Sequence, residues 1–373
     1  MTSAPVHILC VVGARPNFMK IAPIMAAALA SRTVKAKLVH TGQHYDEAMN
    51  DSFFRDLGIP RPDVNLEVGS ASHAVQTAEI MKSFEPILLR EKPDAVLVVG
   101  DVNSTIACAL VAAKMGVKVV HVEAGLRSFD RTMPEEINRV LTDQISDRLY
   151  LTERIAFDNL AREGIGPDKA VFVGNVMIDT LMANVKKAAP ARQTLEKHGA
   201  GAEFSADFGL VTLHRPANVD DPEVLERLLR ALAEISKDVP LVFPVHPRTA
   251  HHIKTNGFDS VIDSPRILRL PPLGYLDLLG LMAKAKLVLT DSGGIQEETT
   301  ALGVPCITLR ENTERPITLT EGTNTLVGRD PAAILRAVED IRTTGGKAGR
   351  VPELWDGKAA QRIVADLASW LGG

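Results

Sequence analysis

The chain has 373 residues, of which 45% are hydrophobic and 24% charged, so we expect two folded domains rather than a disordered chain. Its 42 basic and 46 acidic residues give a formal charge of -4, which provides no overall field for nucleic acid or an anionic membrane surface. No apolar run approaches the about 18 residues of a membrane span, and the N-terminus lacks the basic residues of a secretion signal. The three cysteines lie in apolar runs without metal-ligand spacing. We therefore expect a cytoplasmic protein with reduced cysteines.

Short apolar runs alternate with helix-like segments through the first half of the chain. Apolar runs without polar alternation, separated by helices, are typical of a parallel sheet that is covered on both faces. Residues 1–185 are thus predicted to form a doubly wound, Rossmann-like domain. The expected strands lie at 6–12, 36–40, 95–100, 117–122 and 148–152, and the expected helices at 16–30, 73–90, 103–115, 135–146 and 175–187.

A change of composition at residues 186–205, which are rich in small residues and lack an apolar run, predicts a connector. The alternating pattern then starts again, so residues 186–356 are predicted to form a second Rossmann-like domain, with a C-terminal helix at about 357–373 completing the first. The predicted fold class is α/β, with two doubly wound parallel-sheet domains facing a central cleft. The expected strands of the second domain lie at 208–214, 240–246, 267–270, 286–290, 304–309 and 324–328.

Ligands of such sheets bind outside the carboxyl ends of the strands, and polar residues follow several of the expected strands. The first strand runs into "GARPNFMK", where Arg15 and Lys20 flank the start of a helix. A basic pair at a helix N-terminus suits a phosphate, because free backbone N–H groups and the helix dipole already favour an anion there. The alternative is that both are solvated surface charges.

Three carboxylates follow in the same domain. Asp101 comes directly after "AVLVVG", Glu123 lies in "HVEAGLRS", and Glu135 lies in "MPEEINR". Taken singly, each could be a turn or capping residue, and Thr132 with Glu135 matches a capping box. Their accumulation at strand ends favours proton transfer, because neighbouring carboxylates raise one another's proton affinity.

In the second half, "LVTLHRPAN" ends a strand in His214, and "LVFPVHPR" ends another in His246. The segment "LTDSGGIQEE" places two glycines between a buried strand and a helix, which lets the backbone approach a diphosphate. A glutamate in the first turns, Glu297 or Glu298, can accept ribose hydroxyls. No dinucleotide fingerprint, Walker loop or zinc-binding helix motif is present, so nicotinamide, ATP and zinc chemistry lose support.

Together the motifs resemble the non-hydrolysing UDP-N-acetylglucosamine 2-epimerases, which have the glycosyltransferase B fold. The resemblance implies interconversion of UDP-GlcNAc and UDP-ManNAc by elimination of UDP to 2-acetamidoglucal and re-addition, without cofactor or metal. It also implies a cytoplasmic homodimer that serves cell-surface polysaccharide synthesis. The matching motifs, in chain order, are "GARPNFMK", "TGQHYD", "GDVNST", "HVEAGLRS", "PEEINR", "HRPAN", "PVHPR", "TDSGGIQEE" and "ENTERPITLTEGTNTLVG".

The resemblance also implies roles for individual residues. It does not decide which carboxylate removes the proton; we favour Glu123 and Asp101, with Glu135 stabilising the cationic ring. Residues that match the family's catalytic positions are Asp101, Glu123, Glu135 and His214; those that match substrate-binding positions are Arg15, Lys20, Ser292, Gly293, Gly294, Glu298 and Arg315; and those that match an activating second UDP-GlcNAc site are Gln43, His44 and His246.

Three other functions share part of this pattern. A glycosyltransferase of the same fold would use the "DSGG" donor site but would not need three carboxylates in the other domain. A hydrolysing epimerase would release free ManNAc, and the intact "HVEAGLRS" argues against it. A UDP-sugar sensor would have no need of Asp101, Glu123, Glu135 and His214 together.

Overall fold

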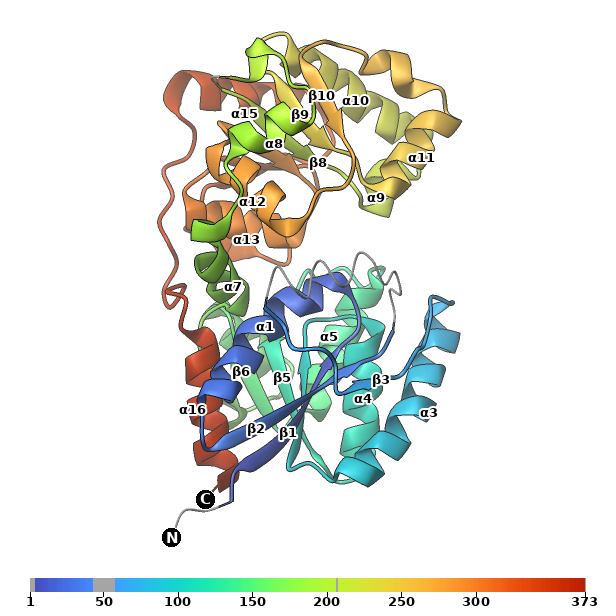
Figure 1. The fold of residues 1–373 in the computed structure, drawn as a ribbon, viewed down its shortest axis with the longest axis vertical. Coiled ribbons are helices and arrows are strands. Elements are labelled where there is room, and N and C mark those ends of the chain that lie inside the picture. The colour runs from blue at the N-terminus through green and yellow to red at the C-terminus, as the bar shows by residue number, and fades with distance from the viewer. Residues whose placement is uncertain (1–3, 43–57, 206, 373) are drawn as a thin grey trace. The chain divides into compact units, whose positions relative to one another are not determined.

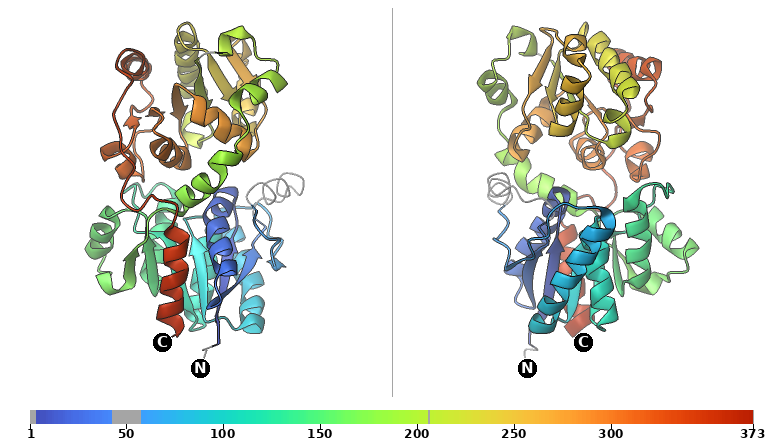
Figure 2. Two further views of the ribbon diagram at one scale, coloured as in Figure 1. Left: turned by 60° about the vertical axis from the view of Figure 1, so that its left-hand side comes forward. Right: turned by 90° about the vertical axis from the view of Figure 1, so that its right-hand side faces the viewer.

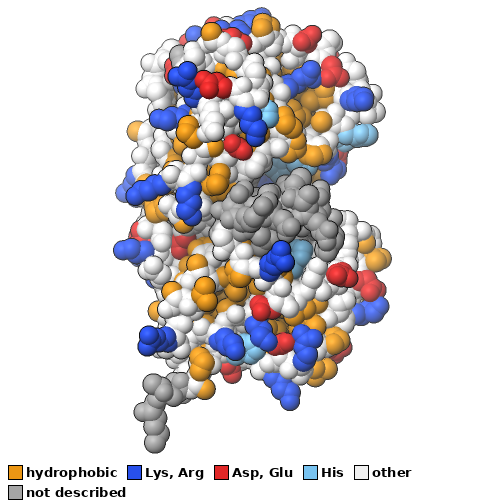
Figure 3. All heavy atoms as spheres, in the orientation of Figure 1, with side chains coloured by type: hydrophobic (Ala, Val, Ile, Leu, Met, Phe, Trp, Pro, Cys, Tyr) orange, Lys and Arg blue, Asp and Glu red, His pale blue; other side chains and the backbone are white. Residues whose placement is uncertain are grey.

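The computed structural model describes residues 4–42, 58–205 and 207–372 (Figure 1). The chain forms two compact units, Met1–Ala183 with Glu353–Gly373, and Asn184–Pro352. On the face seen in Figure 3, basic and acidic side chains are interspersed over both units. No helix among the described residues is both long and apolar enough to cross a membrane.

The described part of the first unit is built on a parallel sheet in the order β3-β2-β1-β4-β5-β6-β7. The strands are β1 (Val6–Val12), β2 (Val34–His40), β3 (Val64–Asn65), β4 (Ala95–Val99), β5 (Lys118–Ala124), β6 (Arg148–Leu151) and β7 (Ala170–Phe172). The helices are α1 (Arg15–Ala30), α3 (His73–Glu91), α4 (Asn103–Lys114), α5 (Pro134–Ile145), α6 (Ile155–Arg162), α7 (Val176–Asn184) and α16 (Ala359–Gly372), with a 3-10 turn η1 (Pro167–Lys169).

Side chains of β1 point alternately to the two faces of this sheet, and both faces are covered. Ile8 and Cys10 pack with α1 and α16 on one face, and Leu9 and Val11 pack with α3 and α4 on the other. Figure 2 shows helices on both faces of this sheet. Because both faces are buried, the central strands need apolar residues at every position, and all of β4 is buried. This is the reason that the strands read as continuous apolar runs in the sequence.

The second unit repeats the architecture with a parallel sheet in the order β10-β9-β8-β11-β12-β13. Its strands are β8 (Gly209–Thr212), β9 (Leu241–Pro244), β10 (Ile267–Leu270), β11 (Leu287–Thr290), β12 (Cys306–Thr308) and β13 (Asn324–Leu326). Its helices are α8 (Ala191–Lys197), α9 (Pro216–Val219), α10 (Pro222–Ser236), α11 (Pro247–Thr255), α12 (Tyr275–Lys284), α13 (Gly293–Leu302), α14 (Pro316–Thr320) and α15 (Pro331–Thr344), with 3-10 turns η2 (Val185–Lys187), η3 (Ala202–Phe204) and η4 (Phe258–Val261). The predicted α/β class is confirmed in both units.

The C-terminal segment belongs to the first unit, where α16 packs against α1. Asp179 of α7 accepts hydrogen bonds from the backbone N–H groups of Ala359 (3.1 Å) and Ala360 (2.7 Å) at the start of α16. Burial raises the pKa of Asp179 to about 6, although both N–H groups oppose this shift. A carboxylate from the middle of the chain thus caps the last helix.

The segment predicted as a connector contains the short helices α8 and η3. One local prediction was wrong. The capping box predicted for Thr132 and Glu135 is absent, because α5 begins one residue later than the box requires, with Met133 at the N-cap. The Thr132 hydroxyl instead donates a 2.6 Å hydrogen bond to Asp130.

Candidate active site

Two of the predicted catalytic carboxylates, Asp101 and Glu123, lie at the carboxyl ends of β4 and β5. Glu123 lies near the end of β5, at a register shift between β5 and β6, and only 3% of the residue is exposed. Its φ angle of 68° lies in the left-handed region, which costs a non-glycine residue about 1–3 kcal/mol. A buried carboxylate on a bulged, strained backbone is the kind of arrangement found at functional sites.

Lys20 of α1 is the ion-pair partner of Glu123. The Lys20 Nζ atom lies 2.6 Å from Glu123 Oε2, and the side chains are 7% and 2% exposed. Gly100, at the end of β4, provides the space for this pair, since a Cβ atom there would lie 2.7 Å from Lys20 Nζ. Gly100 also has a φ angle of 67°, which other residues rarely adopt.

Asp101 is held by an arginine from α5. The Nε and Nη2 atoms of Arg139 donate hydrogen bonds of 3.0 and 2.8 Å to Asp101 Oδ2. The Nη1 atom of Arg139 donates to Glu136, which also accepts the backbone N–H groups of Ser128 and Phe129. Glu136 therefore organises the loop before α5.

Glu135, the residue that the sequence favoured, is half-buried at the start of α5, next to the buried Glu136. The two glutamates of "PEEINR" thus differ in role. Glu136 holds the loop before α5 through the N–H groups of Ser128 and Phe129, and Glu135 is less buried than Glu136. It is the more available of the two for a substrate.

The other charged residues of "HVEAGLRS" form a buried network. His121 Nδ1 lies 2.6 Å from Asp143 Oδ1, and Arg127 Nη2 donates a 2.7 Å hydrogen bond to Asp143 Oδ2. Burial alone would raise the pKa of Asp143, but His121 and Arg127 outweigh it and hold this pKa below its usual range. Arg127 is also paired with Glu163. Glu123, the one carboxylate of this segment, forms its ion pair with Lys20 of α1.

In the second unit, a buried carboxylate that the sequence interpretation did not assign organises the end of β8. Asp291 accepts the backbone N–H groups of His214 (3.0 Å) and Arg215 (2.9 Å), and its Oδ1 lies 2.9 Å from His214 Nδ1. Burial would raise the pKa of Asp291, but His214 and the two N–H groups hold it below the usual range. Asp291 thus orients the His214 ring, and its position directly before Ser292 in "TDSGG" is the signal that could have identified it.

Ser292 is the N-cap residue of α13, and its own side chain makes no capping hydrogen bond. Gly293 begins the helix, followed by Gly294. A Cβ atom at Gly293 would lie 2.8 Å from Glu314 Oε1, so a larger residue would crowd this helix start. A glycine-rich turn at the N-terminus of a helix presents backbone N–H groups to an anion.

Two buried glutamates follow in α13. Tyr275 donates a 2.8 Å hydrogen bond to Glu298 Oε1. Burial raises the pKa of Glu298 to about 7, and the neighbouring Glu297 adds to this shift while Tyr275 opposes it. Arg315 is the ion-pair partner of Glu297, with Nε 2.8 Å from Oε1. Glu298 and Arg315 are therefore both buried and both positioned by neighbours.

The residues predicted for a second ligand are only partly described. Gln43 and His44 lie outside the described residues. His246 is the N-cap of α11, where its ring accepts the backbone N–H of Arg248, and the ring centroid lies 5.6 Å from that of His214.

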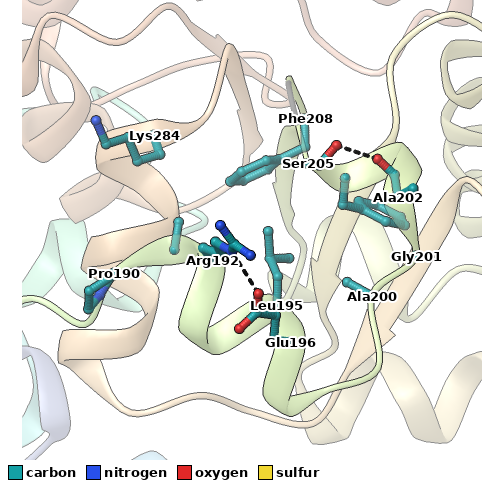
Figure 4. A pocket seen from close by; sticks show the side chains of 12 residues that line it. Pro190, Arg192, Leu195, Glu196, Ala200, Gly201, Ala202, Ser205, Phe208 and Lys284 are labelled. Carbon is teal, nitrogen blue, oxygen red and sulfur yellow. Dashed lines mark hydrogen bonds and ion pairs between the residues drawn. The ribbon is translucent and has the colours of Figure 1, made fainter.

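A cavity of 590 Å³ lies in the second unit (Figure 4). It is lined mainly by small and apolar side chains of α8, η3 and the residues around them, together with Lys284 of α12 and the ion pair of Arg192 and Glu196. None of the predicted site residues lines this cavity. No group of three or more His, Cys, Asp or Glu residues in the described ranges is arranged to hold a metal ion.

Comparison with known proteins gives matches along nearly the whole chain. A family model described as UDP-N-acetylglucosamine 2-epimerase matches residues 27–368. The UDP-N-acetylglucosamine 2-epimerase of Methanocaldococcus jannaschii is 44% identical over 96% of this chain and 97% of its own. The UDP-2,3-diacetamido-2,3-dideoxy-D-glucuronate 2-epimerase of Pseudomonas aeruginosa is 42% identical over 97% of this chain and 99% of its own. A crystal structure of the Methanocaldococcus jannaschii UDP-GlcNAc 2-epimerase with UDP-GlcNAc and UDP has a TM-score of 0.89 and 42% identity, and covers 98% of this chain and 100% of that one.

Proposed function

Because this chain belongs to the UDP-N-acetylglucosamine 2-epimerase family, we propose that it interconverts UDP-GlcNAc and UDP-ManNAc by inverting carbon 2 of the sugar without hydrolysis. The observation that carries the proposal is the buried ion pair of Lys20 and Glu123, packed against Gly100, the residue before Asp101. A carboxylate held in a strained, water-poor position can act on a weakly acidic C–H bond far better than one in bulk solvent.

In the proposed mechanism, a carboxylate removes the proton from carbon 2 while the bond between carbon 1 and the diphosphate oxygen breaks. UDP leaves with the bonding electrons, and 2-acetamidoglucal remains. A carboxylic acid then returns a proton to the opposite face of carbon 2, and the UDP oxygen adds again to carbon 1. Positive charge grows on the ring as UDP leaves, so nearby carboxylates stabilise the transition state. We assign proton transfer to Glu123 and Asp101, and stabilisation of the ring to Glu135.

The same proposal assigns the UDP part of the substrate to the remaining residues. The N-terminus of α13 and the His214 ring, which Asp291 orients, suit the diphosphate. Glu298 suits the ribose hydroxyls, because it is an acceptor held in place by Tyr275. The assigned residues are Arg15, Lys20, His214, Ser292, Gly293 and Gly294 for the diphosphate, Glu298 for the ribose, and Arg315 for the substrate more generally.

Three finer statements rest on the family resemblance. We propose that the enzyme is a cytoplasmic homodimer supplying cell-surface polysaccharide synthesis, and that a second UDP-GlcNAc bound near His246 activates it. Light scattering tests the dimer. The dependence of the initial rate on UDP-GlcNAc concentration tests the activation, which predicts a sigmoidal curve, whereas a hyperbolic curve would contradict it.

The experiment that tests the function is incubation of the pure protein with UDP-GlcNAc, followed by chromatographic separation of the products. UDP-ManNAc is the expected product; free ManNAc with UDP would instead indicate a hydrolysing enzyme, and unchanged substrate a transferase or sensor. A parallel incubation with UDP-2,3-diacetamido-2,3-dideoxy-D-glucuronate is required, because a relative named for that substrate is 42% identical. If the glucuronate is converted faster than UDP-GlcNAc, it is the better substrate, and the proposed substrate would be wrong while inversion at carbon 2 would still hold.

A further inference from the structure

His121 is a fully buried side chain with an acceptor at each ring nitrogen. Its Nδ1 atom lies 2.6 Å from Asp143 Oδ1, and its Nε2 atom lies 2.8 Å from the backbone oxygen of Gly100. The carbonyl oxygen of Gly100 can only accept a hydrogen bond, so Nε2 must carry a hydrogen. His121 is itself part of β5, so the contact with Gly100 ties β5 to the end of β4.

Asp143 extends this connection to the residues that follow Glu123. Its Oδ2 atom accepts hydrogen bonds from the backbone N–H of Gly125 (3.0 Å) and from Arg127 (2.7 Å). The side chains of His121 and Asp143 therefore form a continuous bridge between the backbone at Gly100 and the backbone at Gly125.

The two ends of this bridge lie beside the two candidate proton-transfer residues. Gly100 directly precedes Asp101, and Gly125 comes two residues after Glu123. Gly100 and Gly125 have φ angles of 67° and 75°, so the chain turns sharply at both points and its local geometry depends on what holds the turns.

We propose that His121 and Asp143 are positioning residues that set the placement of Asp101 relative to Glu123. The inference rests on the proposed function, in which both carboxylates act on one carbon atom. A hydrophobic side chain would fill the same space between α5 and the sheet, but it would tie neither backbone turn. Misplacement of a reacting group by about 1 Å can reduce a rate by about 100-fold, so loosening one turn is expected to lower kcat.

Two substitutions of His121 separate positioning from packing. The amide nitrogen of asparagine lies where Nδ1 of histidine lies, so His121→Asn keeps the contact with Asp143 and loses the contact with Gly100. The longer glutamine reaches toward the Nε2 position, so His121→Gln keeps the contact with Gly100. We expect His121→Asn to lower kcat by about 10- to 100-fold with KM within about threefold of wild type, and His121→Gln to recover part of that loss.

Asp366→Asn is the matched control, because it disturbs a polar network on the opposite face of the same sheet, where α16 packs. Asp366 accepts hydrogen bonds from Arg148, at the start of β6, and from Tyr150. This control is expected to lower the unfolding midpoint of the first unit while leaving kcat unchanged.

Wild-type conversion of UDP-GlcNAc in the same assay tests the proposed function, and the ratio of variant to wild-type kcat tests the positioning role. The positioning role is overturned if His121→Asn keeps a wild-type kcat, or if Asp366→Asn, at a similar loss of stability, lowers kcat as much as His121→Asn does. If His121→Asn does not fold, Asp143→Asn serves instead, since its amide has the shape of the carboxylate. A wild-type kcat in that variant would equally refute the inference.

Discussion

Removal of the Lys20 ammonium, in Lys20→Met, is the sharpest test of the buried ion pair. Glu123 would remain as a carboxylate with 2% of its side chain exposed and without its cationic partner. Breaking a buried ion pair by removing one partner costs about 3–5 kcal/mol, most of it from the uncompensated charge. A glutamic acid in water has a pKa of about 4.3, so neutralising a buried carboxylate costs about 4 kcal/mol at pH 7 and about 1 kcal/mol at pH 5. The destabilisation should therefore reach about 4 kcal/mol at pH 7 and shrink markedly toward pH 5.

Tryptophan fluorescence measures this effect in the first unit alone. The chain has two tryptophans, Trp355 and Trp370, and both belong to the segment Glu353–Gly373 that folds with the first unit. Urea unfolding followed by their emission therefore reports on the unit that contains Lys20. Lys82→Met is the matched control, because Lys82 forms an exposed ion pair with Glu79, and such pairs contribute at most about 1 kcal/mol.

The double variant Lys20→Met, Glu123→Gln should recover most of the lost stability, because both charges of this pair are then removed together. A loss below about 1 kcal/mol for Lys20→Met at pH 7, or an equal loss at pH 5 and pH 7, would refute the interpretation of this pair as a buried ion pair.

Substitutions of Glu123 and Gly100 test the first unit, and a substitution of Glu298 tests the second. Glu123→Gln should lose most turnover while UDP affinity, measured by calorimetry, stays near the wild-type value; turnover near wild type would remove Glu123 from proton transfer. Gly100→Ala should destabilise the first unit by at least about 1 kcal/mol in the fluorescence assay, since φ is 67° and the new Cβ would press on Lys20; an unchanged midpoint would contradict the packing described. The raised pKa of Glu298, about 7, means that the folded protein holds a proton that the unfolded chain releases above about pH 4.5. The stability of the second unit should therefore fall by up to about 3 kcal/mol as pH rises from 4.5 to 7, and scanning calorimetry of Glu298→Gln should show a flatter dependence.

The fold class could be predicted from the sequence because its physical cause is local. Strands buried on both faces need apolar residues at every position, and β4 and β11 satisfy this requirement in the printed sequence. The edge strands β3 and β7 were not predicted, since they have only two and three residues and are not fully buried. Short edge strands provide too few residues for a pattern.

The sequence could predict the site residues that lie at strand ends, but not the residues that pair with them. The pattern placed Asp101 and Glu123 at the carboxyl ends of two strands, and Asp101 follows β4 while Glu123 is the second-last residue of β5. It could not reveal that Lys20 pairs with Glu123 across more than 100 residues of sequence. Such partners are decided by which strands and helices become neighbours in the sheet. The same holds for Asp291: its place directly before Ser292 could mark it as a candidate, but its hydrogen-bond donors come from the end of β8, far away in the sequence.

Proton NMR of UDP-GlcNAc with the pure enzyme in deuterium oxide shows whether the proton at carbon 2 is removed and returned during epimerisation. We expect UDP-ManNAc that carries deuterium at carbon 2, with little free sugar. UDP-ManNAc that retains the original hydrogen, or a substrate that remains unchanged, would contradict the proposed mechanism.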